Sequence, residues 1–153
     1  MKNVISFIML ITTVILISSF SNLKDDEGVP PDYGSKETTL IILKLTKMNR
    51  VNEKIKDVFT DNYKGKFVMV DTLDEKYNDI DKYGYVFTPT VSWNEASGSG
   101  DTRMAAYWAY SGTLSDRSTG TKYPIGYEGG AFGPFYKSYA KRLEKVRANN
   151  AAK

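Results

Sequence analysis

Carboxylates are the side chains of this chain best suited to catalysis, because its 153 residues include no histidine and no cysteine. Those two absences remove Ser-His-Asp and Cys-His catalysis, imidazole metal sites and disulfide bonds. Two acidic groups can hydrolyse a glycosidic bond when folding holds them at the right separation. Glu95, Asp101 and Glu128 could supply such a pair, although their spacing selects no two of them. A carboxylate-dependent carbohydrate- or peptide-active enzyme is therefore one function open to this chain.

Two further patterns resemble ligand sites but lack parts of them. The acidic run from Asp71 to Asp81 has neither the glycine nor the ligand spacing of a calcium loop, which favours a solvated surface. The glycine-rich stretch 126–130 could present backbone amides to an anion. It lacks the lysine and threonine of a phosphate-binding loop, which favours a flexible connection. The sequence thus predicts no metal site and no cofactor.

Aromatic residues offer binding chemistry instead. Trp93, Trp108 and Tyr110 could form a platform for a sugar or a peptide, but alternation along the strands places them on one sheet face. Because helices must bury one face of a sheet, core packing is the favoured interpretation of these three side chains. Tyr107 falls on the opposite face and is expected to be exposed.

Positive charge gathers on the last predicted helix, where Lys137, Lys141 and Arg142 are expected to face outward. With Tyr107 and the serine- and glycine-rich loop 94–102, which is expected to be mobile, they form the predicted binding site. The formal net charge of +3 is too small for a dedicated nucleic-acid binder. An envelope protein or polymer is therefore the predicted partner, and the sequence leaves the oligomeric state open.

A strand, a helix and a second strand are predicted over residues 38–70, and the rest of the chain is organised around them. Residues 38–45 form a β-branched apolar run that suits a strand buried on both faces. Residues 51–63 place apolar side chains at helical spacing, and Gly65 is expected to end the helix in the left-handed conformation. Residues 66–70 resume extended structure, so the three elements form a βαβ crossover.

The second half of the chain predicts a short helix that starts with a capping box at Thr72 and Glu75 and buries Leu73, Tyr77 and Ile80. Three strands follow, over residues 85–93, 103–114 and 121–125.

A proline and a glycine add detail to the predicted strands. Pro89 implies a sheet edge or a bulge, and Gly120 is expected to adopt a positive φ in a hairpin turn. An amphipathic helix opened by Gly133 and Pro134 ends the chain. The predicted fold class is α/β (α+β): a single-domain sandwich with a mixed sheet of about five strands, a βαβ unit, an antiparallel hairpin and a C-terminal helix.

The N-terminal residues are predicted to direct export. Lys2, an apolar run over residues 4–17 and small residues near position 21 are typical of a secretory signal peptide, assigned to residues 1–21. Left uncleaved, this segment would be the only membrane anchor. Residues 22–37 are expected to form a flexible tether, 38–149 the α/β domain and 150–153 a disordered tail. The mature chain is predicted to be periplasmic or secreted.

The order of elements resembles three periplasmic α/β domains of the bacterial envelope. The resemblance rests on the strand 39–45, the helix 51–63, the strand 66–70, the strand that begins at Tyr85, and the hairpin turn 114–120. It is to the periplasmic domain of the curli-secretion channel, the amino-terminal domain of the Tol-system periplasmic protein, and lipoprotein activators of peptidoglycan synthases. The chain has no lipid-bearing cysteine, pore insertion or propeller, so a channel or Tol-like role is not implied.

The chain also looks like small secreted proteins of Bacteroidetes-type genomes. Taken together, the residues and the resemblance predict an exported, non-catalytic α/β module that binds a protein or a cell-envelope component. The carboxylate-dependent enzyme is the alternative.

Overall fold

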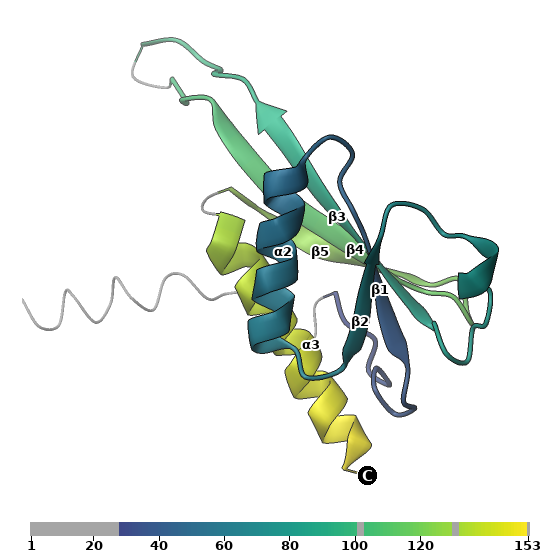
Figure 1. The fold of residues 1–153 in the computed structure, drawn as a ribbon. Helices are drawn as coiled ribbons and strands as arrows, with labels where there is room; N and C mark the ends of the chain where they lie inside the picture. Colours follow the sequence, from purple (N-terminus) through teal and green to yellow (C-terminus); the bar gives the residue numbers. More distant parts are fainter. Residues whose placement is uncertain (1–27, 101–102, 130–131, 153) are drawn as a thin grey trace, which may run out of the picture.

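The fold is a five-stranded sheet in the order β2-β1-β3-β4-β5 with two helices on one face (Figure 1). This computed structural model describes residues 28–100, 103–129 and 132–152. The strands are β1 Thr39–Leu43, β2 Lys66–Val70, β3 Tyr85–Asn94, β4 Tyr107–Asp116 and β5 Lys122–Gly129. The helices are α2 Asn49–Asn62 and α3 Phe132–Ala151, with a 3-10 turn, η1, at Glu75–Tyr77. The predicted α/β (α+β) class, mixed sheet and C-terminal helix are confirmed.

The βαβ unit forms as the apolar periodicity predicts. β1 runs parallel to both β2 and β3, and α2 makes the crossover from β1 to β2. Leu40 and Ile42 pack into the core beneath the helices, whereas Ile41 packs on the other face with Val70 and Val86. Burial on both faces explains why β1 is an unbroken apolar run rather than an alternating one.

Gly65 does not end α2 in a left-handed conformation, and this prediction is wrong. The helix ends at Asn62, and the next residue, Tyr63, has an extended backbone with φ −124° and ψ 118°. The ring of Tyr63 folds back against Gly65, and a Cβ at position 65 would collide with it. Gly65 is therefore required for a close approach rather than for a positive φ. Gly120, by contrast, has the expected positive φ of 72° in the β4–β5 turn.

The connection from β2 to β3 covers the second face of the sheet with two tyrosines. Tyr77 is buried against Ile41 and Val86, with Tyr83 packed beside it. The predicted capping box does not form, because the Thr72 hydroxyl donates to Asp74 Oδ1 at 3.0 Å and only η1 follows. Of the three residues expected to be buried here, only Tyr77 is, since the short turn presents a single side chain to the sheet. Leu73 and Ile80 are 47% and 43% exposed.

Residues 28–36 belong to the packed domain, so the tether predicted over residues 22–37 is wrong for this part. Val29 and Tyr33 are 4% and 0% exposed in the core beneath the helices. The hydroxyls of Tyr33 and Tyr63 lie 2.7 Å apart, and the Tyr139 hydroxyl donates to the Gly28 carbonyl at 3.1 Å. Two large apolar anchors outweigh the loop-like composition around them.

The end of α3 holds the same segment in place. The Asn150 amide donates to the carbonyls of Pro31 and Tyr33, at 2.8 and 3.0 Å. The tail predicted from residue 150 is therefore wrong for residues 150 and 151, which are helical. The predicted signal peptide lies outside the described residues and stays a prediction. Among residues 28–100, 103–129 and 132–152, no helix has the length and apolarity needed to cross a membrane.

Tyr33→Ala should lower the free energy of unfolding by about 3–5 kcal/mol, because it empties a fully buried ring site. Chemical denaturation followed by far-UV circular dichroism measures this. Tyr33→Phe is the matched control: it keeps the ring, removes one hydroxyl of the Tyr33–Tyr63 pair, and should cost only about 1 kcal/mol. A Tyr33→Ala variant as stable as the parent would mean that residues 28–36 are a tether after all.

Candidate functional site

The β3–β4 hairpin carries an exposed pair of tryptophans. Trp93 and Trp108 are direct cross-strand partners, with ring centroids 5.1 Å apart and planes inclined by 58°. They are 50% and 46% exposed. Sequence alternation places them on the face that the helices cover, and Val91 and Tyr110 on that face are indeed partly buried. The interpretation of Trp93 and Trp108 as core residues is nevertheless wrong.

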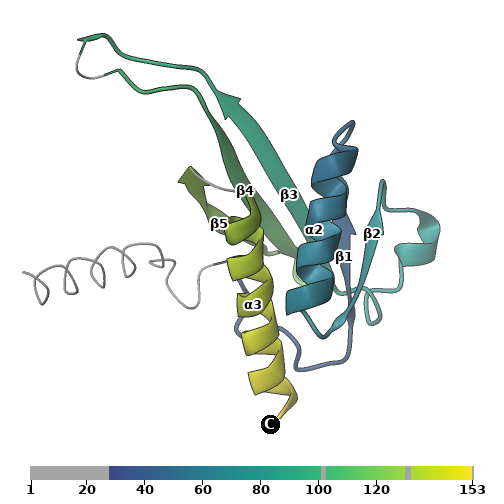
Figure 2. The same cartoon turned by 60° about the vertical axis from the view of Figure 1, so that its left-hand side comes forward.

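The helices leave these rings uncovered because β3 and β4 are longer than the layer above them. β3 and β4 have ten residues each, whereas β1 and β2 have five. The Tyr136 hydroxyl of α3 lies 3.3 and 3.2 Å from the carbonyl oxygens of Thr90 and Ser111, and Phe132 at the start of α3 contacts Tyr110. Beyond that level the hairpin projects past both helices (Figures 1 and 2).

The buried side chain of Asn52 helps to set where β1 stops. Its Oδ1 accepts from the Leu45 amide at 2.8 Å, and its Nδ2 donates to the Leu45 carbonyl at 2.9 Å. These bonds satisfy the Leu45 backbone away from the sheet, and the chain turns through Lys47, which has a positive φ of 60°, into α2. β1 therefore pairs with β3 only at Val86 and Phe87, while β4 follows β3 to Asn94.

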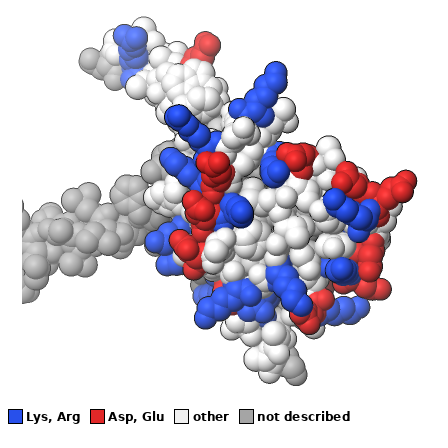
Figure 3. Space-filling model, in the orientation of Figure 1, with Lys and Arg blue, Asp and Glu red and all other residues white. Residues whose placement is uncertain are grey.

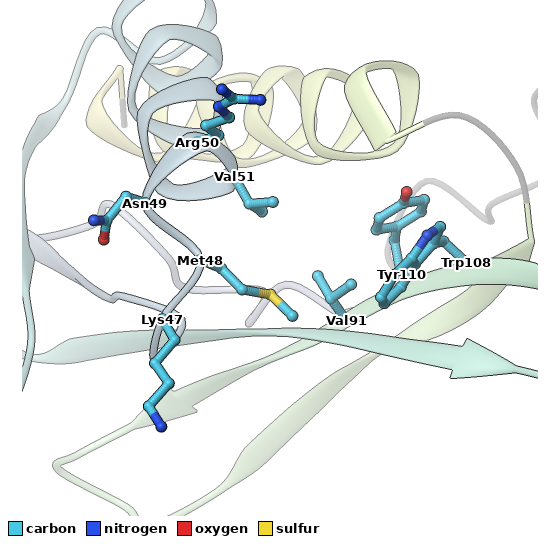
Figure 4. Close-up of a pocket in the computed structure, with 8 residues that line it drawn as sticks. All are labelled: Lys47, Met48, Asn49, Arg50, Val51, Val91, Trp108 and Tyr110. Carbon is cyan, nitrogen blue, oxygen red and sulfur yellow. The ribbon is translucent and has the colours of Figure 1, made fainter.

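A groove of about 470 Å³ lies between the start of α2 and the two long strands. Met48 and Val51 approach from the helix side, and Val91, Trp108 and Tyr110 form the strand side (Figure 4). The remaining lining residues are Lys47, Asn49 and Arg50. The groove is thus mainly apolar, and its charged lining residues are both basic.

The outer part of the hairpin continues the apolar surface. Met104 is 56% exposed, and its backbone pairs with Ser97 through hydrogen bonds of 3.1 and 2.8 Å. Part of the loop 94–102, predicted to be mobile, is therefore tied into the hairpin, and residues 101 and 102 lie outside the described residues. Both signs of charge are interspersed over the body of the molecule, whereas the projecting hairpin is mostly uncharged (Figure 3).

The predicted binding residues lie on two different elements, β4 and α3. Lys137 and Lys141 are exposed on α3, as expected. Arg142 is only 9% exposed, so its predicted outward orientation is wrong: it follows Tyr139 by three positions and therefore falls on the buried flank of the helix. Tyr107 is partly buried at the start of β4, on the sheet face opposite the helices. Its place as a contact with Lys137 and Lys141 stays a prediction.

The catalytic role proposed for Glu95, Asp101 and Glu128 stays a prediction, because only Glu95 has a described side chain. Glu95 is exposed on the hairpin, while Asp101 and the side chain of Glu128 lie outside the description. A different small cleft, of about 130 Å³, is lined by residues that include Asp32, Asp81 and Asp116. No group of three or more acidic side chains within the described residues is placed to hold a metal ion.

Asp116 in that cleft is a turn-forming carboxylate. Its Oδ1 accepts from the Ser118 amide and hydroxyl, at 2.8 and 2.7 Å, and its Oδ2 accepts from the Thr119 hydroxyl at 2.9 Å. Burial would raise the pKa of Asp116, but these hydrogen bonds outweigh it and hold the pKa below the ordinary value of 3.8. A general acid needs a raised pKa, so Asp116 is unsuited to that role.

A second polar cleft, of about 390 Å³, contains Lys36, Lys64, Lys66 and Arg147 near the ends of α2 and α3. Lys66 pairs with Glu37 at 2.6 Å, and Arg147 pairs with Glu144 at 2.7 Å. Ion pairs within the fold thus account for two of the four cations, Lys66 and Arg147.

No protein-family model matches the sequence, and no curated protein matches it either. Two structures of dodecameric PelC from Paraburkholderia phytofirmans are weakly similar to this chain. One is 11% identical to this chain with a TM-score of 0.42, and the match covers 74% of this chain and 90% of the PelC chain. The other is 14% identical with a TM-score of 0.40 and covers 83% and 94%.

A minor lipoprotein from Acinetobacter baumannii is 12% identical with a TM-score of 0.35, and the match covers 76% of this chain and 91% of that one. All three similarities are weak and concern the fold alone. They indicate no activity, so the function must be argued from the geometry.

Asp116→Asn should make stability less dependent on pH in acid. Because the folded pKa is below the unfolded value, the ionised carboxylate stabilises the fold above about pH 4, and this contribution is lost as the pH falls through the folded pKa. Urea unfolding at several pH values should show the variant about 1 kcal/mol less stable at neutral pH and converging with the parent in acid.

Asp74→Asn is the control for this measurement. The Asp74 pKa is also lowered, by hydrogen bonds from Thr72 and Lys76, but the carboxylate is exposed to water and solvent screens it. The Asp74 variant should therefore follow the parent. If the free energy of unfolding changed equally with pH in the Asp116 variant and in the parent, the role assigned to the Asp116 carboxylate would be contradicted.

Proposed function

We propose that the chain is an exported, non-catalytic α/β module that binds a protein or a cell-envelope component through its β3–β4 hairpin. The observation that carries the proposal is the half-exposed Trp93–Trp108 pair beside an apolar groove. Soluble monomers rarely leave contiguous apolar patches of this kind open unless the patch contacts a partner. Export rests on the predicted signal peptide of residues 1–21.

The composition of the surface favours binding over catalysis. Tryptophan, tyrosine, methionine and arginine are the residue types enriched at protein interfaces, and all four occur on or beside this patch, as Trp108, Tyr110, Met48 and Arg50. None of the lining residues of the groove is acidic. The groove therefore lacks the carboxylate pair that the alternative enzymatic function requires.

The combined variant Trp93→Ala and Trp108→Ala should lose partner binding and keep its fold. The rings are half in water, so removing their cross-strand contact should cost only about 1 kcal/mol. The purified protein and the variant are each immobilised and exposed to envelope extract, and retained proteins and polymers are quantified. The parent should retain a component that the variant does not, with nearly unchanged melting temperature.

Lys137→Glu with Lys141→Glu is the matched control, because both lysines are exposed on α3 away from the hairpin. It should retain what the parent retains, and it tests the basic helix surface predicted from the sequence. If the lysine variant failed to retain the component and the tryptophan variant still retained it, the binding surface would be assigned to α3 instead. Equal retention by all three proteins would contradict both surfaces.

A further inference from the structure

We propose that the groove beside Val91 receives an extended, acidic segment of a partner protein, which adds as a strand to the open edge of β3. This inference rests on the proposed function, because it assigns a kind of partner to the same surface. Three properties of the described residues carry it: a stretch of β3 with a neighbouring strand on one side only, an apolar groove next to it, and two basic side chains at the groove.

The open edge follows from the pairing of β3. β1 pairs with β3 only at Val86 and Phe87, so from Thr88 to Asn94 the described residues place a strand on the β4 side alone. Backbone groups along such an edge can pair with an added strand. Pro89 has no N–H group and protects the beginning of this edge. The usable stretch therefore runs from Thr90 to Trp93.

The groove supplies side-chain selectivity to that edge. Successive side chains of an added strand point to opposite faces of the sheet. One set would lie on the face of Val91, Trp93 and Trp108, where the groove accepts apolar groups. The other set would lie beside Thr90 and Ser92, which are exposed on the opposite face. A partner segment that alternates apolar with polar residues fits both surfaces.

The charge at the groove selects the polar residues of the segment. Lys47 and Arg50 are its charged lining residues, and both are exposed. Neither forms an ion pair within the part of the chain that the structure describes. An acidic segment would gain attraction from both cations, which speeds encounter and weakens with added salt.

The shape of the site favours a protein segment over the other possible occupants. A planar bilayer cannot fill a concave groove of about 470 Å³ while also pairing with a strand edge. The planes of the Trp93 and Trp108 rings are inclined by 58°, so the pair does not present one flat surface to a sugar ring. Vesicles and anionic polysaccharide therefore serve as comparison ligands in the test.

The test begins with selection of short random peptides displayed on phage against the immobilised protein. Enriched peptides should alternate apolar residues with others and carry net negative charge. Their affinity, measured by calorimetry, should fall about tenfold or more for the variant Lys47→Glu with Arg50→Glu. It should stay unchanged for Lys137→Glu with Lys141→Glu, which reverses the same number of charges on exposed α3 positions.

Backbone pairing is tested with two N-methylated versions of an enriched peptide. An added strand uses every second amide, so methylation of one alternating set should abolish binding and methylation of the other should be tolerated. Amide resonances of the protein should shift at residues 90–93 and 47–51. Equal affinity of the two methylated peptides, or shifts confined to α3, would overturn strand addition.

The remaining outcomes separate this inference from the proposed function. If no peptide is enriched while envelope extract still yields a component retained only when Trp93 and Trp108 are present, the inference fails and the proposed function stands. Tryptophan-dependent binding of phosphatidylglycerol vesicles or alginate, without peptide binding, overturns the inference in favour of a lipid surface or a polysaccharide. If no peptide, vesicle, polysaccharide or envelope component binds in a way that depends on Trp93 and Trp108, both the inference and the proposed function are overturned.

Discussion

The candidate site depends on two hydrogen bonds between the side chain of Asn52 and the backbone of Leu45. They hold the chain that leaves β1 against the start of α2, so β1 stays short. β3 and β4 have no such constraint and continue for ten residues each. The helices therefore cover the sheet at one end of the long strands and leave it open at the other end. The hairpin, the groove and the free edge of β3 all lie at the open end.

The covered side supplies the stability that this asymmetry requires. Without cysteine the chain has no disulfide, and its core is instead built from aromatic rings and aliphatic residues between the helices and the sheet. Buried tyrosines also need partners for their hydroxyls. Tyr33 and Tyr63 bond to each other, and Tyr139 bonds to the Gly28 carbonyl, so the N-terminal segment is joined to both helices. Burial raises the pKa of Tyr33, Tyr63 and Tyr139 above the ordinary value of 10.0, because the core disfavours the charged phenolate.

Local periodicity was sufficient to predict most elements of the fold. The β-branched run that begins at Thr39, the helical stripe of Ile55 and Phe59, and the turn before Gly120 each depend on neighbours in the sequence, and each forms as predicted. Pro89 also lies where its missing N–H group is tolerated, on the part of β3 beyond the end of β1. Such features need little knowledge of distant residues.

The exposure of the tryptophan pair and the burial of the N-terminal segment, which periodicity did not predict, depend on contacts between distant segments. Alternation places Trp93 and Trp108 on the correct face, but only the relative lengths of strands and helices decide whether that face is covered. Proline, glycine and aspartate around Tyr33 look like a tether, yet burial of its ring depends on Tyr63 and Tyr139, far along the chain. The unequal lengths of the predicted strands 66–70 and 85–93 were the one signal in the sequence for an overhanging hairpin.

Intrinsic fluorescence of the free protein tests the central claim most directly, since Trp93 and Trp108 are the two tryptophans of the whole sequence. If the hairpin face is open, emission should resemble that of indole in water, acrylamide should quench it readily, and neither property should change with protein concentration. Unfolding in denaturant should then shift the emission only slightly. Blue-shifted emission that resists acrylamide in the free protein would contradict the account, because it would mean that the tryptophans are already covered.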